Sequence, residues 1–149
     1  YVYYNKVEYA EHIALVKGNI SPDKPVLVRM HAFSLGSDAL GSADAKDAGI
    51  LQKSMEMVGE AGSGVIVVIR DTSPTDASDR LKQLWSAPSR PVNELRDYGV
   101  GAQILVDLGV RDIILLSNSQ RSIIGLEGFG LRVVETRPVT PNTQSRGDT

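Results

Sequence analysis

The sequence feature that most constrains the fold is a run of apolar, mostly β-branched residues, GVIVVI, at 64–69. Because it has apolar residues at both odd and even positions, a strand there must be covered on both faces, as in parallel sheets flanked by helices. The last third of the chain alternates in the same manner between helical and strand patterns: 96–110, 111–118, 121–130 and 131–138. We therefore predict an α/β fold in which a mixed sheet is covered by helices.

Length and charge narrow the classes of function. The chain has 149 residues, enough for one domain, which we place at 1–140, followed by a polar, disordered tail at 141–149. A net charge of -2 provides no basic surface for nucleic acid, and no apolar run approaches the roughly 18 residues of a membrane span. The absence of cysteine excludes disulfides and thiolate metal sites, and we expect a cytoplasmic protein.

Two segments carry a resemblance to a known family: LRDYGVGAQILVDLGVRDIILLSN at 95–118 and GLEGFGLRVVETRPV at 125–139. They resemble GTP cyclohydrolase II, which opens GTP in the first step of riboflavin synthesis. The middle third is similar in the order of its strands and helices and in Arg29-x-His31. The resemblance implies a GTP cyclohydrolase II-like fold. Such domains are commonly fused behind 3,4-dihydroxy-2-butanone 4-phosphate synthase, and the chain starts with Tyr1 rather than Met, so we expect that synthase as a fused partner.

The resemblance also implies a catalytic zinc bound by three cysteines, but this chain has Ser34, Ala45 and Asp47 at those positions. Zinc prefers sulfur and nitrogen ligands in tetrahedral geometry, and a hydroxyl, a methyl and one carboxylate do not replace three thiolates. We therefore expect no bound metal or other cofactor.

Other positions at which the family acts on GTP also differ. Thr72 and Pro74 replace a Glu and an Arg, Glu94 replaces an Asp, and Ser122 replaces a Lys. The segment 78–93 has no Tyr at which to place the family's catalytic tyrosine. The sequence thus keeps the residues that build helices and strands and loses those that do the chemistry. Our leading hypothesis is an inactive domain retained as a structural, dimerisation or regulatory module for the synthase, or as a docking site for another riboflavin enzyme.

Four residues that the resemblance places at anion-binding positions are retained or conservatively replaced: Arg29, Arg70, Arg96 and Ser117. They could form a residual phosphate-binding site, because guanidinium groups match phosphate geometry. Alternatively, the arginines pair with acids such as Glu94 and Asp97. If these residues bind phosphate, the domain could be a sensor of a nucleotide or flavin, which is our second hypothesis. Our third hypothesis is an active cyclohydrolase with an unusual metal site.

His31 offers two readings. Together with Asp38, Asp44 and Asp47 it could form a metal site of nitrogen and oxygen ligands, although the spacing matches no calcium loop. We favour a hydrogen-bonded structural histidine beside a solvated acidic loop. We also expect His12 to be an ordinary strand residue, and the apolar stripe Leu81, Leu84 and Trp85 to belong to the core or a dimer interface.

Overall fold

A computed structural model describes residues 1–41, 48–85, 94–119 and 125–141, with only the backbone for 83–85 and 94–96. Most of the predicted elements are present. The strands are β1 (Val2–Asn5), β2 (Ala10–Lys17), β3 (Val26–Ala32), β4 (Gly64–Ile69), β5 (Asp112–Leu116) and β6 (Arg132–Arg137). The helices are the π-helical turn η1 (Leu35–Ala39), α1 (Ile50–Ala61), α2 (Asp76–Trp85) and α3 (Glu94–Asp107).

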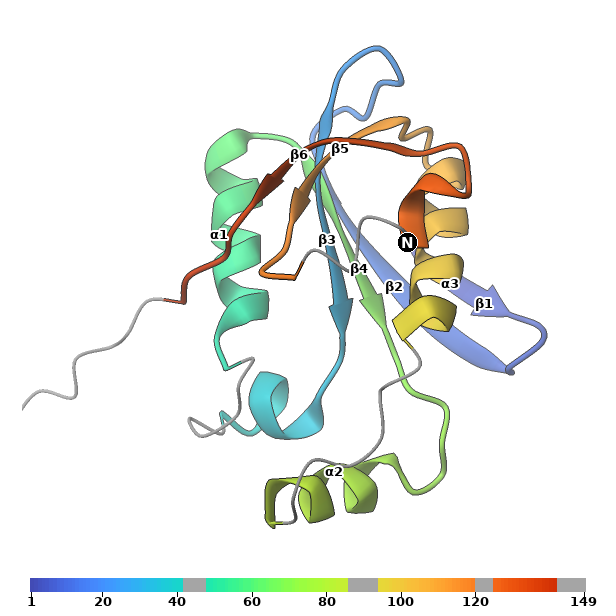
Figure 1. Ribbon diagram of the computed structural model, residues 1–149, viewed down its shortest axis with the longest axis vertical. Coiled ribbons are helices and arrows are strands. Elements are labelled where there is room, and N and C mark those ends of the chain that lie inside the picture. The colour runs from blue at the N-terminus through green and yellow to red at the C-terminus, as the bar shows by residue number, and fades with distance from the viewer. Residues whose placement is uncertain (42–47, 86–93, 120–124, 142–149) are drawn as a thin grey trace, which may run out of the picture.

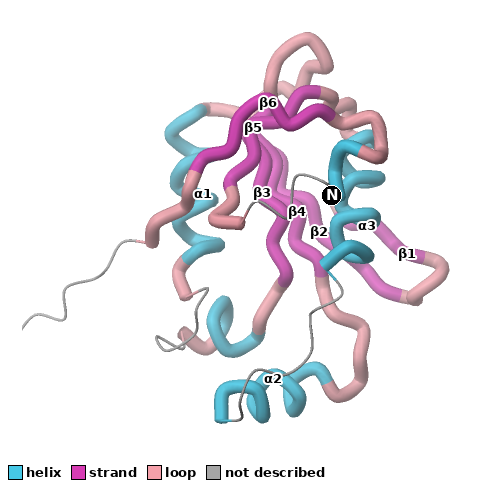
Figure 2. Tube along the Cα trace, in the orientation of Figure 1, coloured by secondary structure: helices cyan, strands magenta, loops and turns pink. Residues whose placement is uncertain are grey.

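The six strands form one mixed sheet in the order β1-β2-β4-β3-β5-β6 (Figure 1). Strands β4, β3, β5 and β6 are parallel to one another, whereas β2 pairs antiparallel with both β1 and β4. Helix α1 lies on one face of the sheet and α3 on the other (Figure 2). The predicted α/β fold with a mixed, helix-covered sheet is therefore confirmed.

The core has one layer on each side of the sheet. Val65, Val67 and Ile69 of β4 pack with α3, whereas Ile66 and Val68 pack on the side of α1. Every residue of β4 is buried, as its continuous apolar run predicted. No helix among the described residues is both long and apolar enough to cross a membrane.

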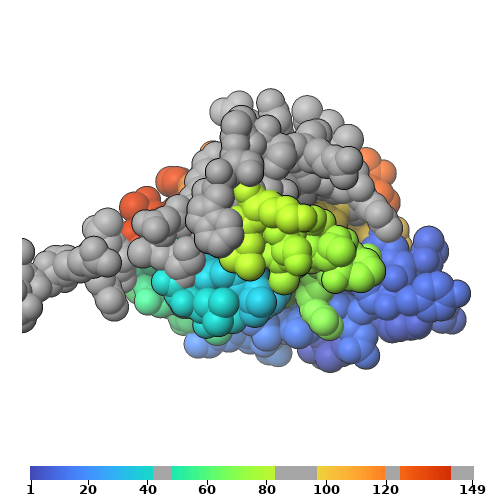
Figure 3. Space-filling view, turned by 90° about the horizontal axis from the view of Figure 1, so that it is seen from below, coloured from blue at the N-terminus to red at the C-terminus, as the bar shows by residue number. Residues whose placement is uncertain are grey.

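The carboxyl ends of β3 and β4 point to the lower part of the molecule in Figure 1, where η1 and α2 are found. Figure 3 shows this end directly, with η1 and α2 side by side. The chain leaves β3 through α1 towards β4, and leaves β5 in the opposite direction towards β6. Ligands of open α/β sheets bind at such divergent strand ends, so the candidate site is sought here.

Three predicted segments differ from the structure or lie outside it. Helix α2 begins at Asp76, five residues before the first residue of the predicted stripe, and the segment after β3 that was expected to be an acidic loop contains the turn η1. The predicted stripe on α2 is not all core, because Leu81 is 47% exposed. The expected tail, apart from Pro141, lies outside the described residues, as do Ala45, Asp47, Asp44 and Ser122.

Candidate functional site

Strand order brings three of the four predicted phosphate-binding residues to the same end of the sheet. Arg29 is the middle residue of β3, level with the end of the neighbouring β5, Arg70 directly follows β4, and Ser117 directly follows β5. Arg96 belongs to the first turn of α3, where the side chains are not described. The common edge agrees with the predicted site, but the binding role of these residues stays a prediction.

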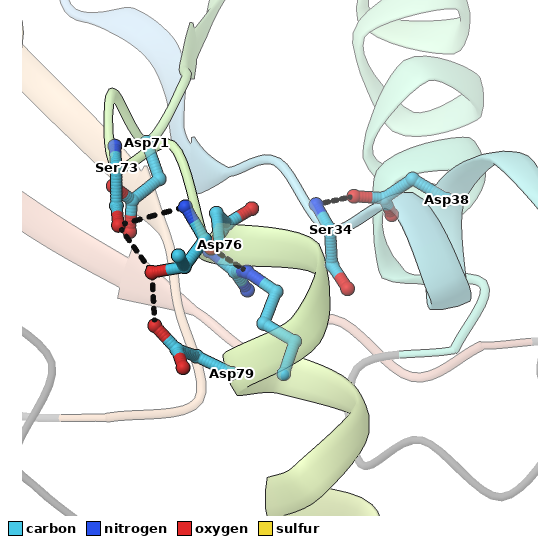
Figure 4. A network of polar contacts seen from close by, with 8 residues as sticks. Ser34, Asp38, Asp71, Ser73, Asp76 and Asp79 are labelled. Carbon is cyan, nitrogen blue, oxygen red and sulfur yellow. Dashed lines mark hydrogen bonds and ion pairs between the residues drawn. The ribbon is translucent and has the colours of Figure 1, made fainter.

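A buried hydrogen-bonded pair closes the turn after β3. Nε2 of His31 lies 2.8 Å from Oδ2 of Asp38, and the two side chains are only 2% and 1% exposed. The backbone N–H of Ser34 donates to the same Oδ2 at 2.8 Å (Figure 4). Because a carboxylate only accepts hydrogen bonds, Nε2 of His31 is the donor. We call His31, Asp38 and the Ser34 N–H the Asp38 clip.

The Asp38 clip decides between the readings of His31. The expected hydrogen-bonded histidine is confirmed. The expected solvated acidic loop is wrong for Asp38, because its carboxylate turns inward to accept two hydrogen bonds and is buried. Nδ1 of His31 and Oδ1 of Asp38 have no hydrogen-bond partner within the described part of the chain.

The contacts of Arg29 and Ser117 hold the strand ends together. Nη1 of Arg29 donates to the carbonyl of Leu116 at 3.1 Å, which ties β3 to the end of β5. Ser117 donates its backbone N–H to the carbonyl of Arg137 and its hydroxyl to the carbonyl of Ser119, at 3.0 and 2.9 Å. These contacts order the edge that the sequence marked as a phosphate site.

His12 contributes a second buried imidazole at this end of the sheet. It is 1% exposed, and its Nδ1 accepts the backbone N–H of Arg70 at 3.2 Å. Burial, and secondarily the nearby Arg70 guanidinium, lower the pKa of His12, so the ring is neutral near pH 7. The predicted placement in a strand is confirmed. Its contact with Arg70 was missed, because it depends on the β2–β4 register rather than on any local motif.

The loop after β4 carries a polar network that we call the α2 collar. Its members are Asp71, Ser73, Thr75, Asp76, Asp79 and Arg80 (Figure 4). Thr75 joins two parts of it, because its hydroxyl contacts that of Ser73 at 3.1 Å and donates to Asp79 at 2.8 Å. Arg80 donates to Asp76 at 2.6 Å. Acidic groups near a helix N-terminus are favoured by the helix dipole, so the collar stabilises α2.

The α2 collar occupies the place where the resemblance puts substrate-contacting residues. Thr72 and Pro74 lie within it, and both are exposed. The collar contains three carboxylates and one guanidinium, Arg80 pairs with Asp76, and the cations Arg70 and Lys82 lie at either end of the segment.

The donors of this chain do not fit the zinc that the resemblance implies. Of the three cysteine positions only Ser34 is described, and it offers a hydroxyl while its N–H bonds to Asp38. The part of the chain that the structure describes has no group of three His, Cys, Asp or Glu residues that could hold a metal. With no thiolate in the whole sequence, the tetrahedral sulfur-rich site cannot be built.

Sequence comparison with known proteins shows to which family the chain is similar. The model of the GTP cyclohydrolase II family matches residues 1–138. The chain is 40% identical to "Riboflavin biosynthesis protein RibBA" of Synechocystis sp., over 93% of the chain and 28% of that relative. It is 36% identical to the Bacillus cytotoxicus protein of the same name, over 99% of the chain and 40% of the relative. It is 38% identical to the Aquifex aeolicus protein of that name, over 93% of the chain and 37% of the relative.

The chain matches only part of the length of each relative. The chain spans 28–40% of the length of these three relatives, so it corresponds to one part of each. Within that part the match to the family model covers nearly every residue, from β1 through β6. The chain belongs to the GTP cyclohydrolase II family.

Proposed function

We propose that this domain is catalytically inactive and serves as a structural, dimerisation or regulatory module for a fused 3,4-dihydroxy-2-butanone 4-phosphate synthase of riboflavin biosynthesis. One observation carries the proposal: a chain without cysteine keeps the family's sheet and helices. The relatives named as riboflavin biosynthesis proteins are two to four times longer than the aligned part, which leaves room for a fused synthase. A cytoplasmic location follows from this role.

The chemistry of the reaction supports inactivity. Hydrolytic opening of a purine ring needs an activated water, and a bound metal can lower the pKa of water from ~15.7 to ~7. Ser34, Ala45 and Asp47 supply no thiolate to hold such a metal. The Asp38 clip instead folds this segment through hydrogen bonds between its own groups.

The other changed positions point the same way. Thr72 and Pro74 lie in the α2 collar, and neither side chain can replace a Glu or an Arg. Glu94 and Ser122 complete the set of degenerate positions, although their side chains lie outside the described residues. The changes at these separate positions remove the family's metal ligands, its acidic groups and its basic groups. We therefore assign no catalytic residue to this chain.

The inactivity is tested on the purified chain by elemental analysis and by a GTP turnover assay with added zinc. We expect zinc well below one ion per chain and no product above the uncatalysed rate. A family member that carries the three cysteines is the positive control for both measurements. Zinc near one ion per chain together with turnover would reinstate the alternative of an active enzyme with an unusual metal site.

The alternative of a phosphate-ligand sensor rests on Arg29, Arg70 and Ser117 on neighbouring strands, with Arg96 in the first turn of α3. The same samples test it, because a ligand that binds only the folded state raises the melting temperature. The inactive-module proposal expects no shift with GTP or FMN. A shift without turnover that Arg70→Ala abolishes would favour the sensor, since Arg70 is exposed and its side chain makes no hydrogen bond or ion pair within the described residues, where only its backbone N–H is bonded, to His12.

The role as a module is tested in the fused polypeptide by deleting residues 1–140 of this chain. We expect lower solubility or lower activity of the synthase, because the deletion removes the surface on which it depends. Synthase activity and yield should both be measured, so that loss of folding is separated from loss of regulation. An unchanged synthase would contradict the module.

A further inference from the structure

The chain beyond β6 is held by a side chain after the strand has ended. The backbone N–H of Ser117 donates to the carbonyl of Arg137 at 3.0 Å, which continues the pairing of β5 with β6. The side-chain amide of Asn118 then takes the place of the next strand residue. Its Nδ2 donates to the carbonyl of Val139, and its Oδ1 accepts the backbone N–H of Val139, both at 2.8 Å. One amide group thus satisfies both backbone groups of Val139.

The side chain of Val139 fills a place in the hydrophobic core. It is 1% exposed and belongs to the buried cluster on the α1 side of the sheet, together with Leu27, Ile50 and Leu116. The chain beyond β6 runs along that side of the sheet (Figure 1). Further on, the Cβ of Pro141 lies 3.3 Å from the place that a Cβ on Gly49, the N-cap of α1, would take. This short segment therefore closes the layer between the sheet and α1.

Residues 138–141, Pro-Val-Thr-Pro, are held in place by few contacts, and we call them the strap. The two prolines have no N–H group, so the strap cannot continue as a fully paired strand. Of its two N–H groups, that of Val139 bonds to Asn118, and that of Thr140 makes no hydrogen bond within the described residues. One side-chain amide and one buried valine are thus the main contacts that keep the strap in its place.

We propose that the strap opens and closes as a unit while the sheet stays folded, and that Asn118 is the residue that holds it closed. Segments with few buried apolar contacts and few hydrogen bonds open locally more easily than the core does. Proline restricts the backbone at both ends of the strap, so the four residues move together. Opening uncovers the α1 layer at the carboxyl end of β5, beside Ser117 of the candidate site. The inference goes beyond the proposed function and does not depend on it.

Asn118 can be replaced without damage to the core. The residue is exposed and follows β5, and its side-chain amide bonds only to Val139 within the described residues. Asn118→Ala therefore leaves no buried cavity and removes both hydrogen bonds from the closed strap. Its effect should be confined to the strap, which separates the proposed role of Asn118 from a general contribution to stability.

The opening is tested by thiol labelling of the full chain, which has no cysteine of its own. Val139→Cys places a small thiol at the buried position, where a thiol-specific disulfide reagent reaches it only when the strap is open. Adding Asn118→Ala should raise the labelling rate about tenfold or more, because the closed state loses two hydrogen bonds. Val58→Cys, at a 4% exposed position of α1 in the same cluster, is the control thiol. Its labelling should be slower and unchanged by Asn118→Ala.

A matched control removes a different side-chain amide. Oδ1 of Asn5 accepts the backbone N–H of Val7 at 3.0 Å in the turn between β1 and β2, far from the strap in the sheet order. Asn5→Ala should therefore leave the labelling rate at position 139 unchanged. Circular dichroism checks that each variant keeps its secondary structure.

The other outcomes overturn the inference. Equally slow labelling at positions 139 and 58 would mean that the strap opens only when the whole chain unfolds. An equal rise at both positions in Asn118→Ala would show a general loss of stability, and no rise at position 139 would show that Asn118 does not hold the strap. Labelling at position 139 as fast as for Thr140→Cys, at an exposed position, would exclude a closed strap. GTP turnover would overturn the proposed inactivity and change none of these rates.

Discussion

Replacing Asp38 with alanine should lower the free energy of unfolding by about 3 kcal/mol, because the substitution removes the acceptor of two buried hydrogen bonds. Nε2–H of His31 and the backbone N–H of Ser34 both donate to Oδ2 of Asp38 at 2.8 Å. The side chains of His31 and Asp38 are almost fully buried, so water cannot replace the lost acceptor. The change is measured by urea unfolding, with the midpoint and slope compared with those of the unmodified chain.

Two variants separate the Asp38 clip from a general effect of losing an acid. Asp38→Asn keeps one oxygen in place for both donors, and we expect it to cost about 1 kcal/mol. Glu56→Ala breaks an exposed pair with Lys53, whose atoms lie 3.0 Å apart, and should change stability by less than about 0.5 kcal/mol. If Asp38→Ala were no worse than Glu56→Ala, the clip would not stabilise this turn.

The strands were predictable from the sequence because the local pattern determines them. A run with apolar residues at both odd and even positions predicted β4, and each residue of this strand is buried in the structure. Parallel strands end at one edge, so the convergence of Arg29, Arg70 and Ser117 followed from strand order. The fold class was thus accessible from periodicity, whereas the phosphate-binding role of these residues came from the resemblance and stays a prediction.

Contacts between distant elements were not predictable in this way. The small residues around Gly36 favour no regular structure, and η1 forms there because Asp38 folds back onto His31. Helix α2 starts at Asp76 because the collar provides hydrogen-bond partners at its first turn, whereas the apolar stripe predicted from the sequence begins only at Leu81. The burial of His12 depends on pairing between β2 and β4, which no local motif records.

Two glycines near the end of α1 should respond in opposite directions to alanine. Gly64 is the first residue of β4, as the predicted strand at 64–69 has it. A Cβ at Gly64 would lie 2.8 Å from the carbonyl oxygen of Leu27 and 3.1 Å from both methyl carbons of Val58. The Leu27 carbonyl belongs to the backbone of β3, and the β-branched Val58 has a restricted χ1 angle. Displacing either neighbour to make room for a Cβ therefore costs free energy. We expect Gly64→Ala to lower the free energy of unfolding by about 2 kcal/mol.

Gly59 is the matched control, because it lies only five residues away, inside α1, and a Cβ there would meet nothing within 4 Å. Alanine is a better helix former than glycine, so Gly59→Ala should raise the free energy of unfolding by about 0.5–1 kcal/mol. Both variants are measured by urea unfolding under the same conditions. Opposite signs would show that close packing of β4 against β3 and α1 requires glycine at position 64. A stabilising Gly64→Ala would instead mean that β3 and α1 can separate at this point, and the tight layer between them would be wrong.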